Sequence, residues 1–175
     1  MKTAIIIVDH GSRRLESNKM LEDVAALFAQ RFAATYPIVE PAHMELAEPS
    51  IATAYAAAVK RGATQVIVCP FFLGPGKHWT TDIPQLTAKA AREFPETRYH
   101  VSPPLGIDEL IVELLAKRAT HCVSHGLSCD SCRGTIRSGD PAIAAKEVDS
   151  EPVPLVCGKC PYQAAGIALP VACAK

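Results

Sequence analysis

The sequence predicts an open parallel α/β sheet of four strands with helices on both faces, followed by an irregular, cysteine-rich C-terminal tail. Short β-branched or apolar runs alternate with longer segments whose apolar residues recur at helical spacing, and this alternation fades near residue 121. Four strand–helix units therefore follow one another along the chain. Because parallel strands need crossover connections, we expect one sheet with helices covering both of its sides.

Two strands are predicted from continuous apolar runs, TAIIIVD at 3–9 and QVIVCPFFL at 65–73. These runs lack the alternation of a strand with one face in water, so we expect both strands to be buried on both faces. Two weaker candidates are PIVEPAHME at 37–45 and TRYHVS at 97–102.

Four helices are predicted from helical spacing and from the residues that begin and end them. Ser50 follows Pro49 and is a suitable N-cap for the second helix, which Gly62 ends, and Pro84 lies in the first turn of the third. The fourth helix carries a stripe of leucine and isoleucine. The predicted ranges are 16–35, 50–61, about 83–94 and about 107–120.

Composition indicates one ordinary domain with an appendage, because the chain has 175 residues and 49% of them are hydrophobic. We place an α/β module at 1–120 and a tail at 121–175. The formal net charge is zero, so composition gives no argument for a nucleic-acid or anionic membrane partner. The apolar run from Ala4 to Val8 is too short for a signal peptide or a membrane span. We therefore expect a cytoplasmic protein.

The tail carries two CxxC pairs, Cys129 with Cys132 and Cys157 with Cys160. In a reducing compartment such cysteines are metal or redox ligands more often than disulfides. Four thiolates suit a tetrahedral Zn²⁺ site or an iron–sulfur cluster. The spacing alone leaves three alternatives open, which are iron–sulfur, zinc and no metal.

Three groups that bind transition metals each come just after a predicted strand. They are His10 in VDHGSR, Glu45 in HMELAEPS and His78 in GPGKHWTTDIP. The carboxyl ends of parallel strands share one rim of a sheet, so we expect these residues to meet there. Glu48 competes with Glu45, because either glutamate could instead cap the helix that begins near Ser50.

The motifs VDHGSR (8–13), ELAEPSI (45–51), PFFLGPGKHWTTDIP (70–84) and PLGIDEL (104–110) together resemble the small class II tetrapyrrole chelatases. That family inserts cobalt or iron into sirohydrochlorin for cobalamin or siroheme biosynthesis. The resemblance covers roughly residues 1–120 and implies the chelatase-type fold. It also implies that His10, Glu45 and His78 bind incoming Co²⁺ or Fe²⁺, with histidine as metal binder and proton acceptor. Relatives with cysteine-rich extensions that hold Fe–S clusters favour such a cluster in the tail.

The resemblance also suggests partners. Larger relatives contain two such modules facing across a cleft, so a single-module chain is expected to form a homodimer. Arg13 and Lys77 are candidates to pair with the carboxylates of the tetrapyrrole, and Trp79 is a candidate to line its pocket.

Two rival functions stand beside the chelatase hypothesis. A non-catalytic metal or tetrapyrrole carrier would use the same ligands. A histidine-nucleophile phosphatase also places His-Gly after a first strand, but it has arginine before the histidine. Here Asp9 stands in that place and would repel a phosphate anion.

Overall fold

The computed structural model of the chain describes residues 2–124. The chain divides into two units, Met1–Asp108 and Glu109–Lys175, and the last described helix begins the second unit. The predicted boundary near residue 121 stays a prediction, and the four cysteines of the two CxxC pairs lie outside the described residues. The elements, in chain order, are β1 (Thr3–Asp9), α1 (Leu15–Arg31), β2 (Ile38–His43), α2 (Ile51–Lys60), β3 (Gln65–Pro70), the π-helix η1 (His78–Asp82), α3 (Ile83–Arg92), β4 (Arg98–Val101) and α4 (Glu109–Ser124).

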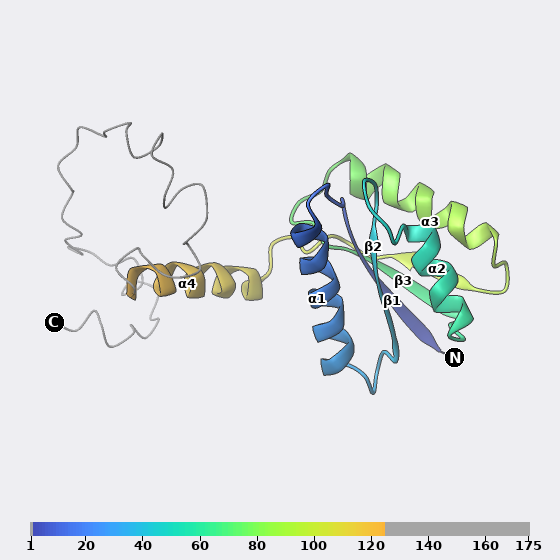
Figure 1. The fold of residues 1–175 in the computed structure, drawn as a ribbon, viewed down its shortest axis with the longest axis horizontal. Helices are drawn as coiled ribbons and strands as arrows, with labels where there is room; N and C mark the ends of the chain where they lie inside the picture. The colour runs from blue at the N-terminus through green and yellow to red at the C-terminus, as the bar shows by residue number, and fades with distance from the viewer. Residues whose placement is uncertain (1, 125–175) are drawn as a thin grey trace. The chain divides into compact units, whose positions relative to one another are not determined.

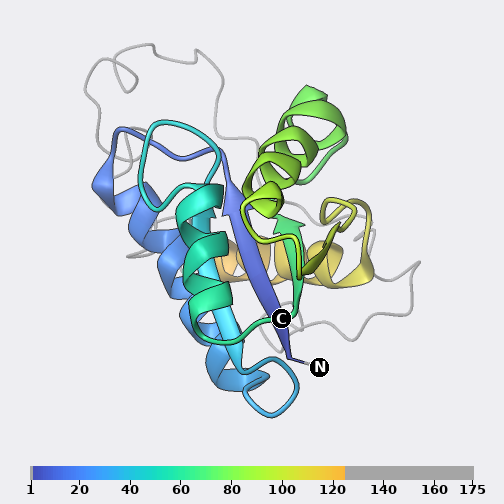
Figure 2. The same ribbon diagram turned by 90° about the vertical axis from the view of Figure 1, so that its right-hand side faces the viewer.

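The four strands form one open parallel sheet in the order β2-β1-β3-β4, which confirms the predicted four-stranded parallel sheet. The predicted irregular tail stays a prediction. α1 covers one face, and α2 and α3 cover the other (Figures 1 and 2). β1 and β3 are the central strands. All strands point the same way, so the carboxyl ends of β1, β2 and β3 lie along one rim.

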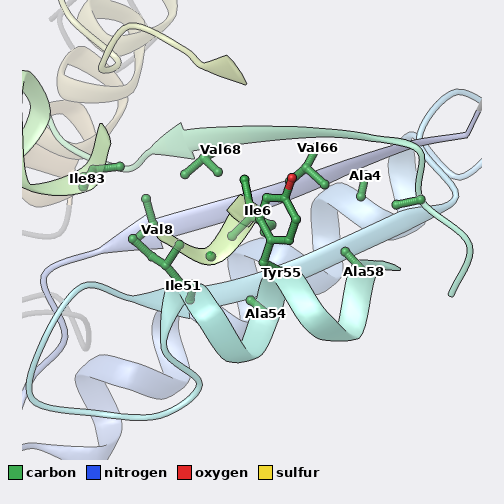
Figure 3. Packing of buried hydrophobic residues seen from close by; sticks show 14 of the residues in the cluster. Ala4, Ile6, Val8, Ile51, Ala54, Tyr55, Ala58, Val66, Val68 and Ile83 are labelled. Atoms are coloured by element: carbon green, nitrogen blue, oxygen red, sulfur yellow. The ribbon is translucent and has the colours of Figure 1, made fainter. Parts of the chain in front are cut away.

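Buried apolar side chains fill both sides of the sheet. On the α2 and α3 side, Ile6, Val8 and Val66 pack against Tyr55 and Ile83 (Figure 3). The smaller core beneath α1 contains Ile5, Ile7, Leu21, Ala25 and Val39. β1 contributes to both cores and is buried on both faces, as its continuous apolar run predicts.

β3 differs from its prediction in burial and in length. Val66 and Val68 are fully buried, whereas Ile67 and Cys69 on the other face are only partly buried. The cause is that α1 packs chiefly against β1 and β2. The strand also ends at Pro70 instead of residue 73, because its last pair with β1 is Val8 with Pro70.

Local side-chain and backbone chemistry explains the start of α2 and the place of a proline in β2. The N-cap prediction is confirmed, since the Ser50 side chain accepts a hydrogen bond from the Thr53 amide. Pro41 sits in the middle of β2, where an edge strand tolerates a residue without an N–H. Among the described helices, none combines the length and the apolar composition that crossing a bilayer requires.

Candidate metal site at the strand ends

The structure brings the three predicted ligand residues together at the rim. His10 directly follows β1, Glu45 follows β2 and His78 begins η1. His10 Nε2 lies 3.8 Å from Glu45 Oε2, and the ring centroids of His10 and His78 are 5.2 Å apart. The three side chains are 42%, 55% and 43% exposed, so solvent and a dissolved metal reach all of them.

These three side chains approach one another in pairs. Among residues 2–124 there is no cluster of three or more His, Cys, Asp or Glu side chains already gathered around one point. His10 is the shared member, because Glu45 and His78 each contact it. The arrangement is therefore open, unlike the closed four-ligand cage of a structural metal site.

Backbone pairing continues past β1 and β2 and fixes the loops that carry His10 and Glu45. The Met44 amide donates to Asp9 O at 2.8 Å, and the Glu45 amide donates to His10 O at 3.0 Å. Gly11 has a φ of +81°, and a Cβ atom there would lie 2.3 Å from Glu45 O. Glycine is therefore required at position 11, because only a residue without a side chain allows the two loops to approach so closely.

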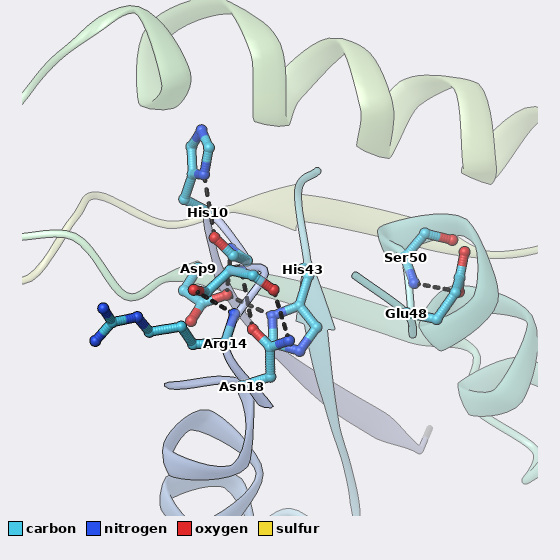
Figure 4. Close-up of polar contacts among 9 residues, drawn as sticks. Asp9, His10, Arg14, Asn18, His43, Glu48 and Ser50 are labelled. Atoms are coloured by element: carbon cyan, nitrogen blue, oxygen red, sulfur yellow. Dashed lines mark hydrogen bonds and ion pairs between the residues drawn. The ribbon is translucent and has the colours of Figure 1, made fainter. Parts of the chain in front are cut away.

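An aspartate and a buried histidine support this junction. The Asp9 carboxylate accepts hydrogen bonds from the Gly11 amide at 2.9 Å and from His43 Nδ1 at 2.6 Å (Figure 4). His43 is fully buried, whereas His10 points away from this cluster. Sequence analysis missed His43. The available signal was a histidine in a predicted strand, two residues before the candidate ligand Glu45.

The turn after β1 is braced from α1. The Ser12 amide donates to Asn18 Oδ1 at 2.9 Å, and Asn18 Nδ2 donates back to Ser12 O at 2.9 Å. Asn18 is buried, so this pair holds the chain that leaves His10 against the start of α1. The loop after β1 is thus held by hydrogen bonds at His10 and at Ser12.

Hydrogen bonding leaves a lone pair of His10 available. Its Nδ1 lies 3.2 Å from Gly11 O, and a carbonyl oxygen only accepts, so in this contact Nδ1 carries the hydrogen. In the neutral ring, Nε2 then presents a lone pair toward the Glu45 carboxylate. Two electron-pair donors that face each other in this way suit a bound cation.

The structure separates the two competing glutamates. Glu48 Oε2 accepts from the Ser50 amide at 2.6 Å and from Thr53 Oγ1 at 2.9 Å, at the start of α2. The Ser50 amide and then the Thr53 hydroxyl hold the pKa of Glu48 below its usual range. Glu48 therefore supports the N-cap residue Ser50, and Glu45 is the glutamate beside His10.

The loop after β3 leads into η1, and sequence analysis did not predict this π-helix. His78 Nδ1 lies 2.9 Å from Asp82 Oδ2 within this π-helix. The Trp79 Nε1–H donates to Ser102 O at 3.1 Å, which ties η1 to the chain after β4. Arg13 lies three residues after His10, and Lys77 directly precedes His78. Both side chains are exposed.

Comparisons with known proteins identify the family of the chain. The CbiX family model matches residues 4–122. The chain is 53% identical over 135 residues to the chloroplastic sirohydrochlorin ferrochelatase of Arabidopsis thaliana, covering 75% of the chain and 59% of that relative. It is 38% identical over 120 residues to the sirohydrochlorin ferrochelatase of Bacillus subtilis, covering 67% and 44%. The chain thus spans about half the length of these curated relatives.

A solved structure gives the same result. The sirohydrochlorin chelatase SirB from Bacillus subtilis subspecies spizizenii, in complex with cobalt, aligns with a TM-score of 0.59 and 37% identity. The alignment covers 69% of this chain and 51% of that one. The family match extends from β1 into α4 and includes His10, Glu45 and His78. The chain belongs to the CbiX family of class II chelatases.

Proposed function

We propose that the chain inserts Co(II) or Fe(II) into a sirohydrochlorin-type tetrapyrrole. The observation that carries the proposal is the meeting of His10, Glu45 and His78 on an open, solvent-reached rim, with 3.8 Å between His10 Nε2 and Glu45 Oε2. The names of the family relatives support the same reaction. The two curated relatives are named as ferrochelatases and the solved structure is a complex with cobalt, so we retain both metals as substrates.

The donor set suits the capture and release of a metal substrate. Imidazole nitrogen binds borderline metals such as Co(II) and Fe(II), and it exchanges them near neutral pH. The Glu45 carboxylate adds negative charge that offsets part of the metal's charge. All three side chains are about half exposed, so they can rotate onto one ion and later yield it to the macrocycle. Four thiolates would hold the metal too firmly for such delivery.

Insertion also releases protons. A free-base macrocycle loses two pyrrole N–H protons as a divalent metal enters, so bases must stand beside the ring. Neutral imidazole and carboxylate both accept protons at neutral pH, and they are the groups present at this rim. We assign proton acceptance to the same three residues, on the metal-facing side of the bound macrocycle.

The rest of the chain supplies candidates for substrate binding and assembly. Arg13 and Lys77 flank the ligand loops as cations for the tetrapyrrole's carboxylates. Trp79 would contribute ring surface only, because its N–H is engaged by Ser102. A homodimer, a cytoplasmic location, and an Fe–S cluster or Zn²⁺ at Cys129, Cys132, Cys157 and Cys160 rest on sequence reasoning. The Arabidopsis thaliana relative is named as chloroplastic.

The test is anaerobic incubation of the purified chain with sirohydrochlorin and Co(II) or Fe(II), followed by the absorption spectrum of the macrocycle. We expect insertion well above the rate without protein, and a loss of about 10²–10⁴-fold in His10→Ala and His78→Ala. Glu45→Ala should lose less. The matched control is His100→Ala, which removes an exposed imidazole from β4.

Two outcomes would reject the proposal. Metal and macrocycle binding without faster insertion would indicate a carrier. Insertion at the wild-type rate in both histidine variants would show that the rim does not perform the reaction.

A further inference from the structure

His78 makes a hydrogen bond to a carboxylate that the proposed reaction has not yet used. Its Nδ1 lies 2.9 Å from Asp82 Oδ2, four residues further along η1. The Asp82 side chain is 25% exposed and that of His78 is 43% exposed. Asp82 is therefore the less exposed member of the pair.

We propose that Asp82 is a positioning residue that sets the tautomer of His78. An ionised carboxylate only accepts hydrogen bonds, so the ring nitrogen that faces it must carry the hydrogen. With the hydrogen on Nδ1, the neutral ring presents the Nε2 lone pair to the metal substrate. This inference rests on the proposed function, because it assigns a partner to one of the metal donors.

The π-helix explains why this pair is well placed. The Ile83 amide bonds to His78 O, which closes a wider turn than that of an α-helix. Ile83 is fully buried in the core, and the Trp79 side chain is bound to Ser102 O. Asp82 is thus fixed to the core by its neighbour, while His78 stays on the open side. Single π-turns are frequent at functional sites for this kind of reason.

In both histidines of the site, Nδ1 is hydrogen-bonded to an oxygen atom, and the partner differs. Gly11 O occupies Nδ1 of His10 at 3.2 Å, and Asp82 occupies Nδ1 of His78 at 2.9 Å. Both Nε2 atoms are consequently left as donors for a metal. Asp82 holds the His78 ring more firmly than Gly11 O holds that of His10, since a hydrogen bond to a charged acceptor is stronger than one to a carbonyl.

The direct test reads the tautomer in the metal-free protein, without any activity measurement. Imidazole ¹⁵N spectra at a pH of about 8, where an ordinary histidine is neutral, distinguish Nδ1–H from Nε2–H. We expect Nδ1–H for His78 in the wild type and in Asp82→Asn, whose amide oxygen still accepts. We expect a mixture or Nε2–H in Asp82→Leu. A wild-type His78 with its hydrogen on Nε2 would overturn the inference, even if the leucine variant failed to fold.

A second measurement compares Co(II) affinity in the same variants. Loss of a partner that orients a metal-binding histidine costs about 10–100-fold in affinity, so Asp82→Leu should bind Co(II) that much more weakly and Asp82→Asn should retain most of it. The control is Asp23→Leu, which removes an aspartate paired with Lys19 four residues earlier on α1. Wild-type Co(II) affinity in Asp82→Leu would overturn the inference.

The two proposals fail in distinguishable ways. If His78→Ala abolishes insertion while Asp82→Leu retains both the Nδ1–H tautomer and Co(II) binding, only the role of Asp82 is wrong. If His78→Ala leaves insertion unchanged, the proposed function of the rim fails, whatever the tautomer of His78.

Discussion

Asp9 and His43 pair in the register of β1 and β2, and their side chains meet in a 2.6 Å hydrogen bond between His43 Nδ1 and Asp9 Oδ1. Asp9 directly precedes His10, and His43 lies two residues before Glu45. One partly buried hydrogen bond therefore joins the strand ends next to two of the three proposed ligands. The His10 side chain points away from this pair (Figure 4).

Replacing His43 with leucine tests this support. The change removes the hydrogen bond to the Asp9 carboxylate, which is 21% exposed and keeps its bond from the Gly11 amide, so we expect a loss of about 0.5–1.5 kcal/mol in the free energy of unfolding. Removal of His43 Nε2, which is buried without a hydrogen-bond partner among the described residues, offsets part of this loss. Urea denaturation measures the loss, and Co(II) affinity should fall with it. The control is Thr87→Val. Thr87 Oγ1 is buried without a hydrogen-bond partner in the described part of the chain, so its removal should be neutral or stabilising. Equal stability of His43→Leu and wild type would contradict the role of the pair.

Gly11→Ala should cost both stability and activity. Its φ of +81° is unfavourable for alanine by about 1–2 kcal/mol, and the new Cβ would meet Glu45 O at 2.3 Å. Glu45 must then move away from His10. The matched variant is Gly62→Ala, with a φ of +90° and no neighbour closer than 3.7 Å. Gly62→Ala should lose a similar amount of stability to the unfavourable φ and should keep the wild-type insertion rate. Thermal melting and the insertion assay separate the two effects, and full activity in Gly11→Ala would refute the close-approach argument.

Much of the fold was predictable because its signals are local. The run from Thr3 to Asp9 forms one strand whose residues between the two ends are all buried, and Ser50 caps α2 as its position after Pro49 indicates. The rim was predictable because parallel topology alone places strand ends together. This is why His10, Glu45 and His78 could be grouped from a sequence that separates them widely.

What escaped prediction depends on tertiary pairing. The role of His43 follows from its register opposite Asp9, which no local pattern gives. That Glu48 faces Ser50 and Thr53 while Glu45 lies beside His10 also follows from the folded structure and not from a local pattern. The π-helix at His78 is too short to show a repeating pattern of apolar residues. The partial exposure of Ile67 depends on where α1 packs.

Glu48→Gln should weaken the start of α2 in a pH-dependent way. Hydrogen bonds from Ser50 and Thr53 lower the folded-state pKa of Glu48, so its carboxylate stabilises the fold above the ordinary glutamate pKa of about 4.3. That contribution is lost as the pH falls through the lower folded-state value. The melting temperature of the variant should therefore lie below that of wild type near pH 7, and the gap should close in acid. A gap that widens in acid would contradict the assignment.

The tail should be separable from the insertion reaction. Changing Cys129, Cys132, Cys157 and Cys160 together to serine in the full chain should leave chelatase activity, because none of the four belongs to a strand-end motif. An Fe–S cluster would make anaerobically purified wild type brown, and the variant colourless; zinc would give a colourless protein with about one ion per chain. Loss of insertion in a folded variant would show that the tail takes part in the chemistry.

The most direct test of the site is the position of a bound metal substrate. A crystal soaked with Co(II) under anaerobic conditions, with anomalous data collected at the cobalt edge, locates the ion without reference to turnover. We predict one peak at the rim, about 2.0–2.2 Å from the Nε2 atoms of His10 and His78 and from a Glu45 carboxylate oxygen. Cobalt bound elsewhere on residues 2–124, with this rim empty at saturating metal, would contradict the account.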